Sequence, residues 1–262
     1  MLSPTVLGVD PTRQPPLRPR DPLNQEQPIS LTYAFLYCLD RQEGLFTVMA
    51  GTLLDGDPTN NFIRRHLTFN PGGILNGAEN GVVAGNYLYV CCDAGLVVVD
   101  ISKIGTEIVE AALKLNPDGK RVVTLKELEK VVQTPDPNLL KVVSVIPLNK
   151  AKAVRIQFRY AFVVDCEGLK VVDITDPAAA RLVEGAKVPF RDAHNLYLAR
   201  TYAYVAAGKD GLALVDIEKA EQPKLDQIYT GEGKLNDVRD VKVGMTNAST
   251  FAYLANGHHG LA

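Results

Sequence analysis

Four side chains that can bind anions or transfer protons recur at one place in a repeated segment of the chain. They are Glu79, Lys152, His194 and Arg239, and each stands just ahead of a predicted strand. His194 could transfer a proton, while Lys152 and Arg239 could clamp a small anion. An ordinary ion-pair network with water is the alternative use of the same side chains. The sequence therefore predicts one candidate site, provided that the fold gathers these four places.

Two further groups contain residue types that ligate metals. His258 and His259 stand in a predicted hairpin turn, where they could bind a metal or an exogenous haem iron, or be merely solvated. In the segment LLDGDPTNN, Asp55, Asp57 and Asn61 place oxygen donors at a spacing similar to that of calcium loops. This segment lacks the terminal glutamate and the full DxDxDG pattern, so a plain turn is the alternative.

Catalytic and nucleotide-binding motifs are absent from the sequence. It contains no GxSxG, no Walker motif and no GxGxxG that opens a helix, which favours a protein that is not an enzyme. The 28 Lys and Arg residues are balanced by 30 Asp and Glu, so no overall field favours nucleic acid. No apolar run is long enough for a membrane-spanning helix, which takes about 18 residues.

The start of the chain and its cysteines bear on its compartment. The first residues, MLSPTVLGVD, lack the basic and apolar regions of a signal peptide. Either the protein stays in the cytoplasm, or this chain is an internal piece of a longer precursor. Cys38, Cys91, Cys92 and Cys166 form no CxxC or CxxCH, so the sequence predicts no zinc ribbon and no covalently attached haem. We predict that they are buried free thiols.

The elements that must position these side chains form a repeat, seen best at the aromatic residue that opens the second strand of each unit. The copies are YLYVCCDAGL at Tyr87, YAFVVDCEGL at Tyr160, YAYVAAGKDGL at Tyr202, FAYLANGHHGL at Phe251 and a looser YAFLYCLDRQEGLFTV at Tyr33. Tyr202 follows Tyr160 by 42 residues, and Phe251 follows Tyr202 by 49. The 73 residues from Tyr87 to Tyr160 hold one unit and an insert of 31. A period in the low forties made of short strands is typical of a β-propeller.

One unit is predicted to contain four strands, at 153–158, 160–165, 169–174 and 181–188. The third strand is apolar at successive positions, as expected when both of its faces are buried between neighbouring blades. We therefore expect Val98, Val171, Val172 and Val215 to be buried. A glycine is expected to supply a positive φ in the turn before each third strand, at Gly95, Gly168, Gly211 and Gly260. Asp100, Asp173 and Asp216 end the third strands and are expected to accept hydrogen bonds from turn amides.

Two segments differ from the repeat. Residues 1–28 form a Pro-rich linker or arm, with six prolines between 11 and 28. An insert at 104–138 contains TLKELEKVV (124–132), in which Thr124 and Glu127 form a capping box that predicts one short helix. An insert outside the blade core is a plausible place for a partner to bind.

The repeat resembles the LVIVD repeats of bacterial and archaeal β-propellers. The matching segments are 85–102 (GNYLYV with GLVVVDIS), 159–177 (RYAFVV with GLKVVDITDP) and 201–223 (TYAYVA with GLALVDIEKAEQP). The resemblance covers about 78–262 well and 29–77 loosely. It implies a periplasmic or extracellular location and, in some members, attachment to multihaem cytochrome regions.

The expected fold is an all-β propeller of four-stranded blades over 29–262, with about five blades begun and the last incomplete. We expect another chain or a C-terminal continuation to complete it, because an unpaired edge recruits strands and makes an isolated chain associate. The leading hypothesis for function is a non-catalytic scaffold that mediates protein–protein interaction in an exported assembly. One alternative is a domain or subunit of a multihaem cytochrome complex, whose haems lie in a neighbouring segment or chain. The other alternative is a hydrolase or lyase that acts at the mouth of the central channel.

Overall fold

The structure is a computed structural model that describes residues 31–50, 63–117, 135–245 and 249–262. Three predicted features lie outside the described residues. They are the Pro-rich arm (1–28), the candidate calcium ligands Asp55, Asp57 and Asn61, and the helix expected at 124–132.

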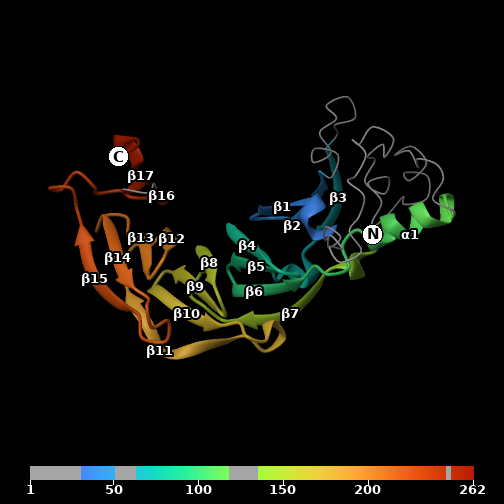
Figure 1. Cartoon of the computed structure of the whole chain (residues 1–262), viewed down its shortest axis with the longest axis horizontal. Helices are drawn as coiled ribbons and strands as arrows, with labels where there is room; N and C mark the ends of the chain where they lie inside the picture. The colour runs from blue at the N-terminus through green and yellow to red at the C-terminus, as the bar shows by residue number, and fades with distance from the viewer. Residues whose placement is uncertain (1–30, 51–62, 118–134, 246–248) are drawn as a thin grey trace, which may run out of the picture. The chain divides into compact units, whose positions relative to one another are not determined.

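The described residues form five β-sheets with the strand arrangement of propeller blades, here numbered 1 to 5 in chain order (Figure 1). Blade 1 contains β1 (Phe35–Asp40), β2 (Gly44–Met49) and β3 (Arg64–Phe69). Blade 2 contains β4 (Asn80–Ala84), β5 (Tyr87–Cys92), β6 (Gly95–Asp100) and β7 (Lys141–Ile146). Blade 3 contains β8 (Ala153–Gln157), β9 (Tyr160–Asp165), β10 (Gly168–Asp173) and β11 (Arg181–Pro189). Blade 4 contains β12 (Asn195–Ala199), β13 (Tyr202–Ala206), β14 (Leu212–Asp216) and β15 (Lys224–Tyr229), and blade 5 contains β16 (Asp240–Met245) and β17 (Thr250–Ala255).

The contacts divide the chain into two compact units. The propeller unit comprises the described residues within 39–44, 70–100 and 142–262, and the blade-1 unit comprises the described residues within 31–38, 45–69 and 101–141. Within the propeller unit, the first strands of successive blades lie side by side: β8 packs against β4 and β12, and β12 packs against β16. The first strand of each blade is therefore the innermost one, as a propeller requires.

The core of the propeller unit lies between neighbouring blades. Val171 packs with Val215 in the cluster between blades 3 and 4, whereas Val172 packs with Val98 in the cluster between blades 2 and 3. All four valines are fully buried, so the prediction from the apolar third strands is confirmed. Because side chains alternate along a strand, successive valines serve opposite faces of one sheet.

The repeated turns behave as the sequence predicts. Gly168 has φ +140, and a Cβ there would lie 2.2 Å from the carbonyl oxygen of Val188, so only glycine fits. Asp173 Oδ1 accepts from the Thr175 amide at 2.9 Å, and Asp216 Oδ1 accepts from the Glu218 amide at the same distance. These two aspartates therefore stabilise turns.

Blade 1 begins differently from the other blades. Tyr33 was expected to open a strand, but it lies in a 3₁₀ turn (η2, Leu31–Ala34), and β1 begins at Phe35. Tyr33 is largely exposed whereas Phe35 is buried, so Phe35 is the aromatic residue that anchors this strand. Tyr87, Tyr160 and Tyr202 do open β5, β9 and β13, and Phe251 is the second residue of β17.

The described part of the insert contains a helix, α1 (Thr106–Leu115), which lies ahead of the segment expected to be helical. Its buried side includes Ile108 and Ala111. None of the helices among the described residues is long and apolar enough to cross a bilayer.

Blade 5 turns towards a third strand, as expected. Leu261 bridges Ala255 of β17, and Leu254 exchanges two backbone hydrogen bonds with Ala262, at 2.9 and 3.0 Å. Phe251 and Tyr253 of β17 remain about half exposed, because no further blade covers them among the described residues.

Candidate functional site at the inner ends of the blades

The four predicted site residues occupy equivalent backbone positions in the propeller unit. Each stands one residue before the innermost strand of its blade. Each donates its backbone N–H to a carbonyl oxygen of the second strand: Glu79 to Cys91, Lys152 to Val164, His194 to Ala206 and Arg239 to Ala255, at 2.8–3.1 Å. The same backbone bond therefore sets all four positions, whatever side chain they carry.

The structure brings three of these side chains into one cluster, here called the mouth cluster, with Asp192 and Asp237. His194 Nε2 lies 2.9 Å from Asp192 Oδ1 and 3.1 Å from Arg239 Nη1. Arg239 also donates from Nε to Asp237. Lys152 Nζ donates to the Ala193 carbonyl oxygen at 2.9 Å and lies 4.0 Å from Asp192 Oδ1.

Glu79 is paired separately. Its carboxylate lies 2.6 Å from Arg41 Nη2. Both residues line an open hollow of about 590 Å³ within the propeller unit, together with Leu39, Asp40, Gln42 and Ala78. Among the described residues, Glu79 is thus paired with Arg41. Lys152 and His194 instead lie near Asp192, and His194 also contacts Arg239.

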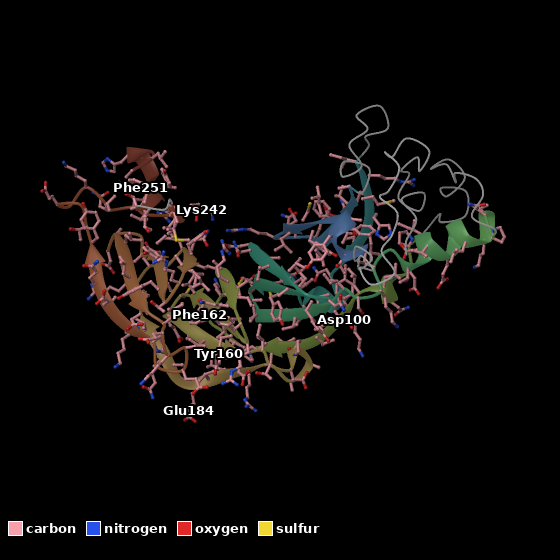
Figure 2. The ribbon with its side chains drawn as sticks, in the orientation of Figure 1. Asp100, Tyr160, Phe162, Glu184, Lys242 and Phe251 are labelled. Carbon is pink, nitrogen blue, oxygen red and sulfur yellow. The ribbon has the colours of Figure 1, made fainter. Side chains whose placement is uncertain are left out.

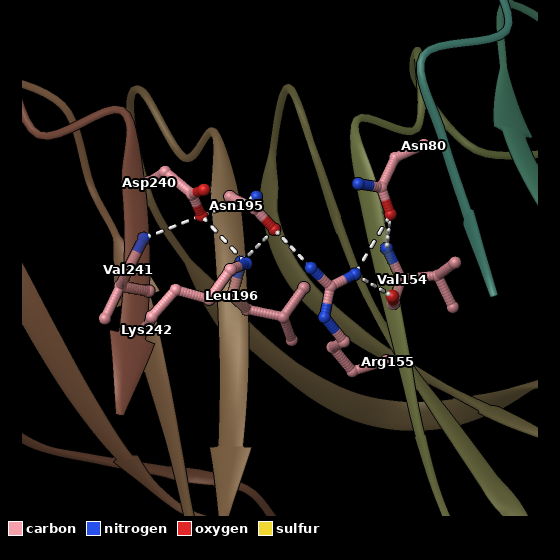
Figure 3. A network of polar contacts seen from close by, with 8 residues as sticks. All are labelled: Asn80, Val154, Arg155, Asn195, Leu196, Asp240, Val241 and Lys242. Atoms are coloured by element: carbon pink, nitrogen blue, oxygen red, sulfur yellow. Dashed lines mark hydrogen bonds and ion pairs between the residues drawn. The ribbon is translucent and has the colours of Figure 1, made fainter. Parts of the chain in front are cut away.

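A second row of polar side chains crosses the beginnings of the innermost strands, at their first and third residues (Figure 3). Arg155 donates from Nη1 to Asn80 Oδ1 at 3.1 Å and from Nη2 to Asn195 Oδ1 at 3.3 Å. Asn195 Nδ2 in turn donates to Asp240 Oδ1 at 2.7 Å, and Lys242 Nζ lies 3.5 Å from the same oxygen. One continuous polar row therefore links blades 2, 3, 4 and 5.

The mouth cluster is electrically balanced when His194 is neutral, because Lys152 and Arg239 face Asp192 and Asp237. The Nε2 atom of His194 has a single hydrogen-bonding direction. With a proton it donates to Asp192, and without one it accepts from Arg239.

The two turn histidines lie apart from this arrangement. His258 and His259 are exposed in a 3₁₀ turn (η7, Gly257–His259) that follows β17. Within the part of the chain that the structure describes, no three His, Cys, Asp or Glu side chains lie close enough to hold a metal ion. The two histidines therefore have no third protein ligand among those residues.

Sequence reasoning missed Asp192 and Asp237, although the repeat contained a signal for them. DAHN (192–195) and DVRD (237–240) have the same pattern, an aspartate two residues ahead of the site residue and an Asn or Asp directly after it. Sequence reasoning also missed a buried triad of the blade-1 unit. In it, His66 Nδ1 lies 3.2 Å from Thr47 Oγ1, and Nε2 lies 2.6 Å from Glu107 Oε1. Thr47 is fully buried, so its hydroxyl is closed to a substrate.

The comparison with known families agrees with this repeated geometry. The family model described as LVIVD repeat matches residues 77–104, 149–186 and 190–230. These three segments of the chain are LVIVD repeats. The three LVIVD segments correspond to the first three strands of blade 2, to most of blade 3 and to blade 4. They include Glu79, Lys152 and His194, whereas Arg239 lies beyond them.

Solved structures similar to this LVIVD-repeat chain share little sequence with it. The computationally designed protein Ika8 is 9% identical, with a TM-score of 0.51 over 87% of this chain and 54% of Ika8. PorZ, a surface component of the type-IX secretion system of Porphyromonas gingivalis, is 15% identical, with a TM-score of 0.42 over 87% and 23% of the two chains. AztD of Citrobacter koseri is 12% identical, with a TM-score of 0.38 over 84% and 52%.

At these identities the likeness concerns the fold alone. The chain spans about half of Ika8 and AztD and about a quarter of PorZ. No curated protein matches the chain.

Proposed function

We propose that this LVIVD-repeat chain is a non-catalytic propeller scaffold that binds other proteins in an exported assembly. The observation that carries the proposal is the pairing inside the mouth cluster. Lys152, His194 and Arg239 each contact a carboxylate or a carbonyl oxygen of the chain itself. A general acid–base site would instead leave a titratable group directed at a substrate.

The outer surface supports an interaction role. Large apolar side chains stand exposed on the propeller unit, among them Phe158, Tyr229 and Leu261. Exposed apolar side chains are typical anchors of protein–protein contacts when they gather beside a hollow.

The test is a reconstitution with purified components. A tagged full-length chain is isolated from its native host, co-purifying proteins are identified, and each is purified and titrated against the chain. We expect at least one partner to bind in a saturable way, with His194→Gln and Lys152→Met leaving its affinity unchanged. Failure of every purified candidate to bind would count against the scaffold role.

The exported location and the multihaem partner are proposals that follow from the family resemblance. Fractionation of the native host tests the first, with the protein expected outside the cytoplasm. The absorption spectrum of the isolated complex tests the second, with a c-type haem band expected from the partner. A partner without haem would eliminate the cytochrome alternative and leave the scaffold intact.

A second candidate function is acid–base chemistry on an anion at the mouth cluster. The observation that favours it is the position of His194 Nε2, between a carboxylate and a guanidinium. A hydrolase or lyase of this kind should lose at least about a hundredfold in rate in His194→Gln. Equal rates in His194→Gln, Lys152→Met and the parent would eliminate it.

A further inference from the structure

Phe158 is the most exposed large apolar side chain among the described residues of the propeller unit. It is 91% exposed, and its backbone has φ +54 in the two-residue turn between β8 and β9. The equivalent turns contain Gly85 with φ +59 and Arg200 with φ +55. Glycine adopts this conformation freely, whereas an aromatic residue is strained in it. Neither local geometry nor burial explains a phenylalanine at this place.

A hollow of about 340 Å³ lies directly beside Phe158, between the β8–β9 turn and the β12–β13 turn. Phe162, Ile217 and Ala220 contribute apolar surface to it, and both Phe162 and Ile217 are buried side chains of the core between blades 3 and 4. Figure 2 labels Phe162 and Tyr160, both of which line the hollow. The hollow is therefore a fixed part of the blade interface and does not need a mobile loop to form it.

A polar group of the same hollow lacks a partner. Gln157 Nε2 donates to the Arg200 carbonyl oxygen at 2.9 Å, which holds the two turns together. Gln157 Oε1 is buried and accepts no hydrogen bond from the described residues. A buried acceptor of this kind is unfavourable unless an incoming N–H or O–H reaches it.

The rim of the hollow carries charges of both signs. Arg159 contacts Tyr160 and lies 3.5 Å from Glu221, and Tyr160 also donates to Glu221. Arg200 and Glu218 complete the rim, and no partner side chain of either is found in the described part of the chain. Two arginines and two glutamates thus surround one exposed aromatic ring and one apolar hollow.

We propose that this surface, here called the turn patch (157–162, 200–201 and 217–221), is a contact between two copies of the chain. In a two-fold contact the same patch faces itself, so the Phe158 ring of each copy enters the hollow of the other. The patch has equal numbers of arginines and glutamates, so it can complement a second copy of itself turned by two-fold symmetry. A strongly acidic or basic partner would instead meet like charges.

This inference deepens the proposed scaffold role by naming one of its contacts, and the two can fail separately. A parent chain that stays monomeric overturns the turn-patch contact and leaves binding of other proteins untouched. Failure of all purified partners overturns the scaffold role while a dimer through the turn patch remains.

The experiment measures the dimer dissociation constant by sedimentation velocity over a wide range of concentrations of the full chain. Phe158→Gly should weaken the dimer by at least about tenfold, because it removes an anchor from the centre of the contact. At concentrations where both proteins are monomeric, the same variant should unfold at a higher denaturant concentration than the parent, because glycine relieves the positive φ. If Phe158 served only the stability of the fold, its replacement would not weaken the dimer and stabilise the chain at the same time.

Two further variants make the result specific. Ala220→Arg occupies the hollow and keeps Phe158, so it should weaken the dimer to a similar degree. Phe251→Ser removes a half-exposed aromatic residue on β17, outside the turn patch, and should leave the dissociation constant unchanged. A monomeric parent, a Phe158→Gly variant that dimerises like the parent, or a dimer lost only in Phe251→Ser would each overturn the proposal.

Discussion

The four cysteines differ in their surroundings, and this controls their reactivity. Cys91 and Cys92 are buried in β5, as expected. Cys38 is only partly buried and Cys166 is exposed in the β9–β10 turn, so the prediction of a buried thiol is wrong at Cys166 and only partly right at Cys38. Burial raises the pKa of the Cys91 thiol well above its ordinary value, and burial also raises the pKa of Cys92. Because the thiolate is the reactive form, both should be inert in the folded protein.

Alkylation followed by mass spectrometry tests this difference. At mildly alkaline pH, iodoacetamide should modify Cys166 rapidly and leave Cys91 and Cys92 unmodified until the chain is unfolded. Cys166→Ser is the control that should abolish the rapid reaction. Rapid labelling of Cys91 in the native protein would show that β5 is more open than the structure indicates.

Tyr89 makes stability depend on alkaline pH. Burial in the core between blades 2 and 3 raises the pKa of Tyr89 to about 12. Its phenol then stays neutral in the folded state while it ionises near pH 10 in the unfolded chain. The resulting stability is present below pH 10 and is lost as the pH rises towards 12. We expect this single group to lower the free energy of unfolding by on the order of 2 kcal/mol across that range.

Urea unfolding of the parent and of Tyr89→Phe between pH 9 and 12 measures this contribution. The variant should lose less stability over the range, because its ring has no proton to release. Parallel curves for the two proteins would mean that Tyr89 does not titrate differently in the folded and unfolded chains.

At the scale of single elements, β10, the third strand of blade 3, has fully buried valines that face opposite sides of the sheet. Val172→Asp would place an unpaired carboxylate in a dry layer and should lower the free energy of unfolding by more than about 3 kcal/mol. Leu182 is the control, because it pairs with Val172 across β10 and β11 but is about half exposed. Leu182→Asp should stay within about 1 kcal/mol of the parent. Similar losses in the two variants, measured by urea unfolding, would contradict the blade assignment.

Helix α1 is held by a partly buried hydrogen bond to His66 as well as by apolar contacts. Glu107 Oε1 contacts His66 Nε2, and Glu107 Oε2 is buried without a partner among the described residues. Glu107→Ala leaves His66 unpaired and should destabilise the blade-1 unit by about 1–3 kcal/mol. Glu110→Ala, on the exposed side of the same helix, should have little effect. Hydrogen exchange of the α1 amides measures the difference, and equal exchange in the two variants would contradict this role.

The elements that could be predicted from sequence are those whose signals lie within a few consecutive residues. The strands of blade 3 match their predicted bounds to within one or two residues, because an apolar run, a glycine and an aspartate recur in each copy. Helix α1 was missed because the capping box at Thr124 gave a stronger local signal elsewhere in the insert. The contact of His194 with Arg239 joins residues 45 positions apart, and the one between Arg155 and Asn195 joins residues 40 apart. Such pairs come together only because the innermost strands of neighbouring blades pack side by side.

At the scale of the whole molecule, Arg155 connects three blades. Its two terminal nitrogens reach Asn80 of blade 2 and Asn195 of blade 4 from a strand of blade 3. Arg155→Lys keeps the charge but cannot span both acceptors, because an ammonium is a single point donor. We expect a loss of about 1–3 kcal/mol and faster hydrogen exchange in both β4 and β12.

The control for this prediction is Arg181→Lys. Arg181 is mostly exposed and lies 3.5 Å from Asp173, so its replacement should change neither stability nor exchange. Faster exchange in β8 alone would mean that Arg155 stabilises its own strand and does not connect its neighbours.

The shared backbone bond of Glu79, Lys152, His194 and Arg239 has an evolutionary consequence. Because the main chain alone holds each position, its side chain can be exchanged without unfolding the blade that carries it. Each of these four copies of the repeat thus contributes one independently variable side chain at the inner end of its blade. Point mutations can therefore change these side chains one at a time while the backbone of the blades stays the same.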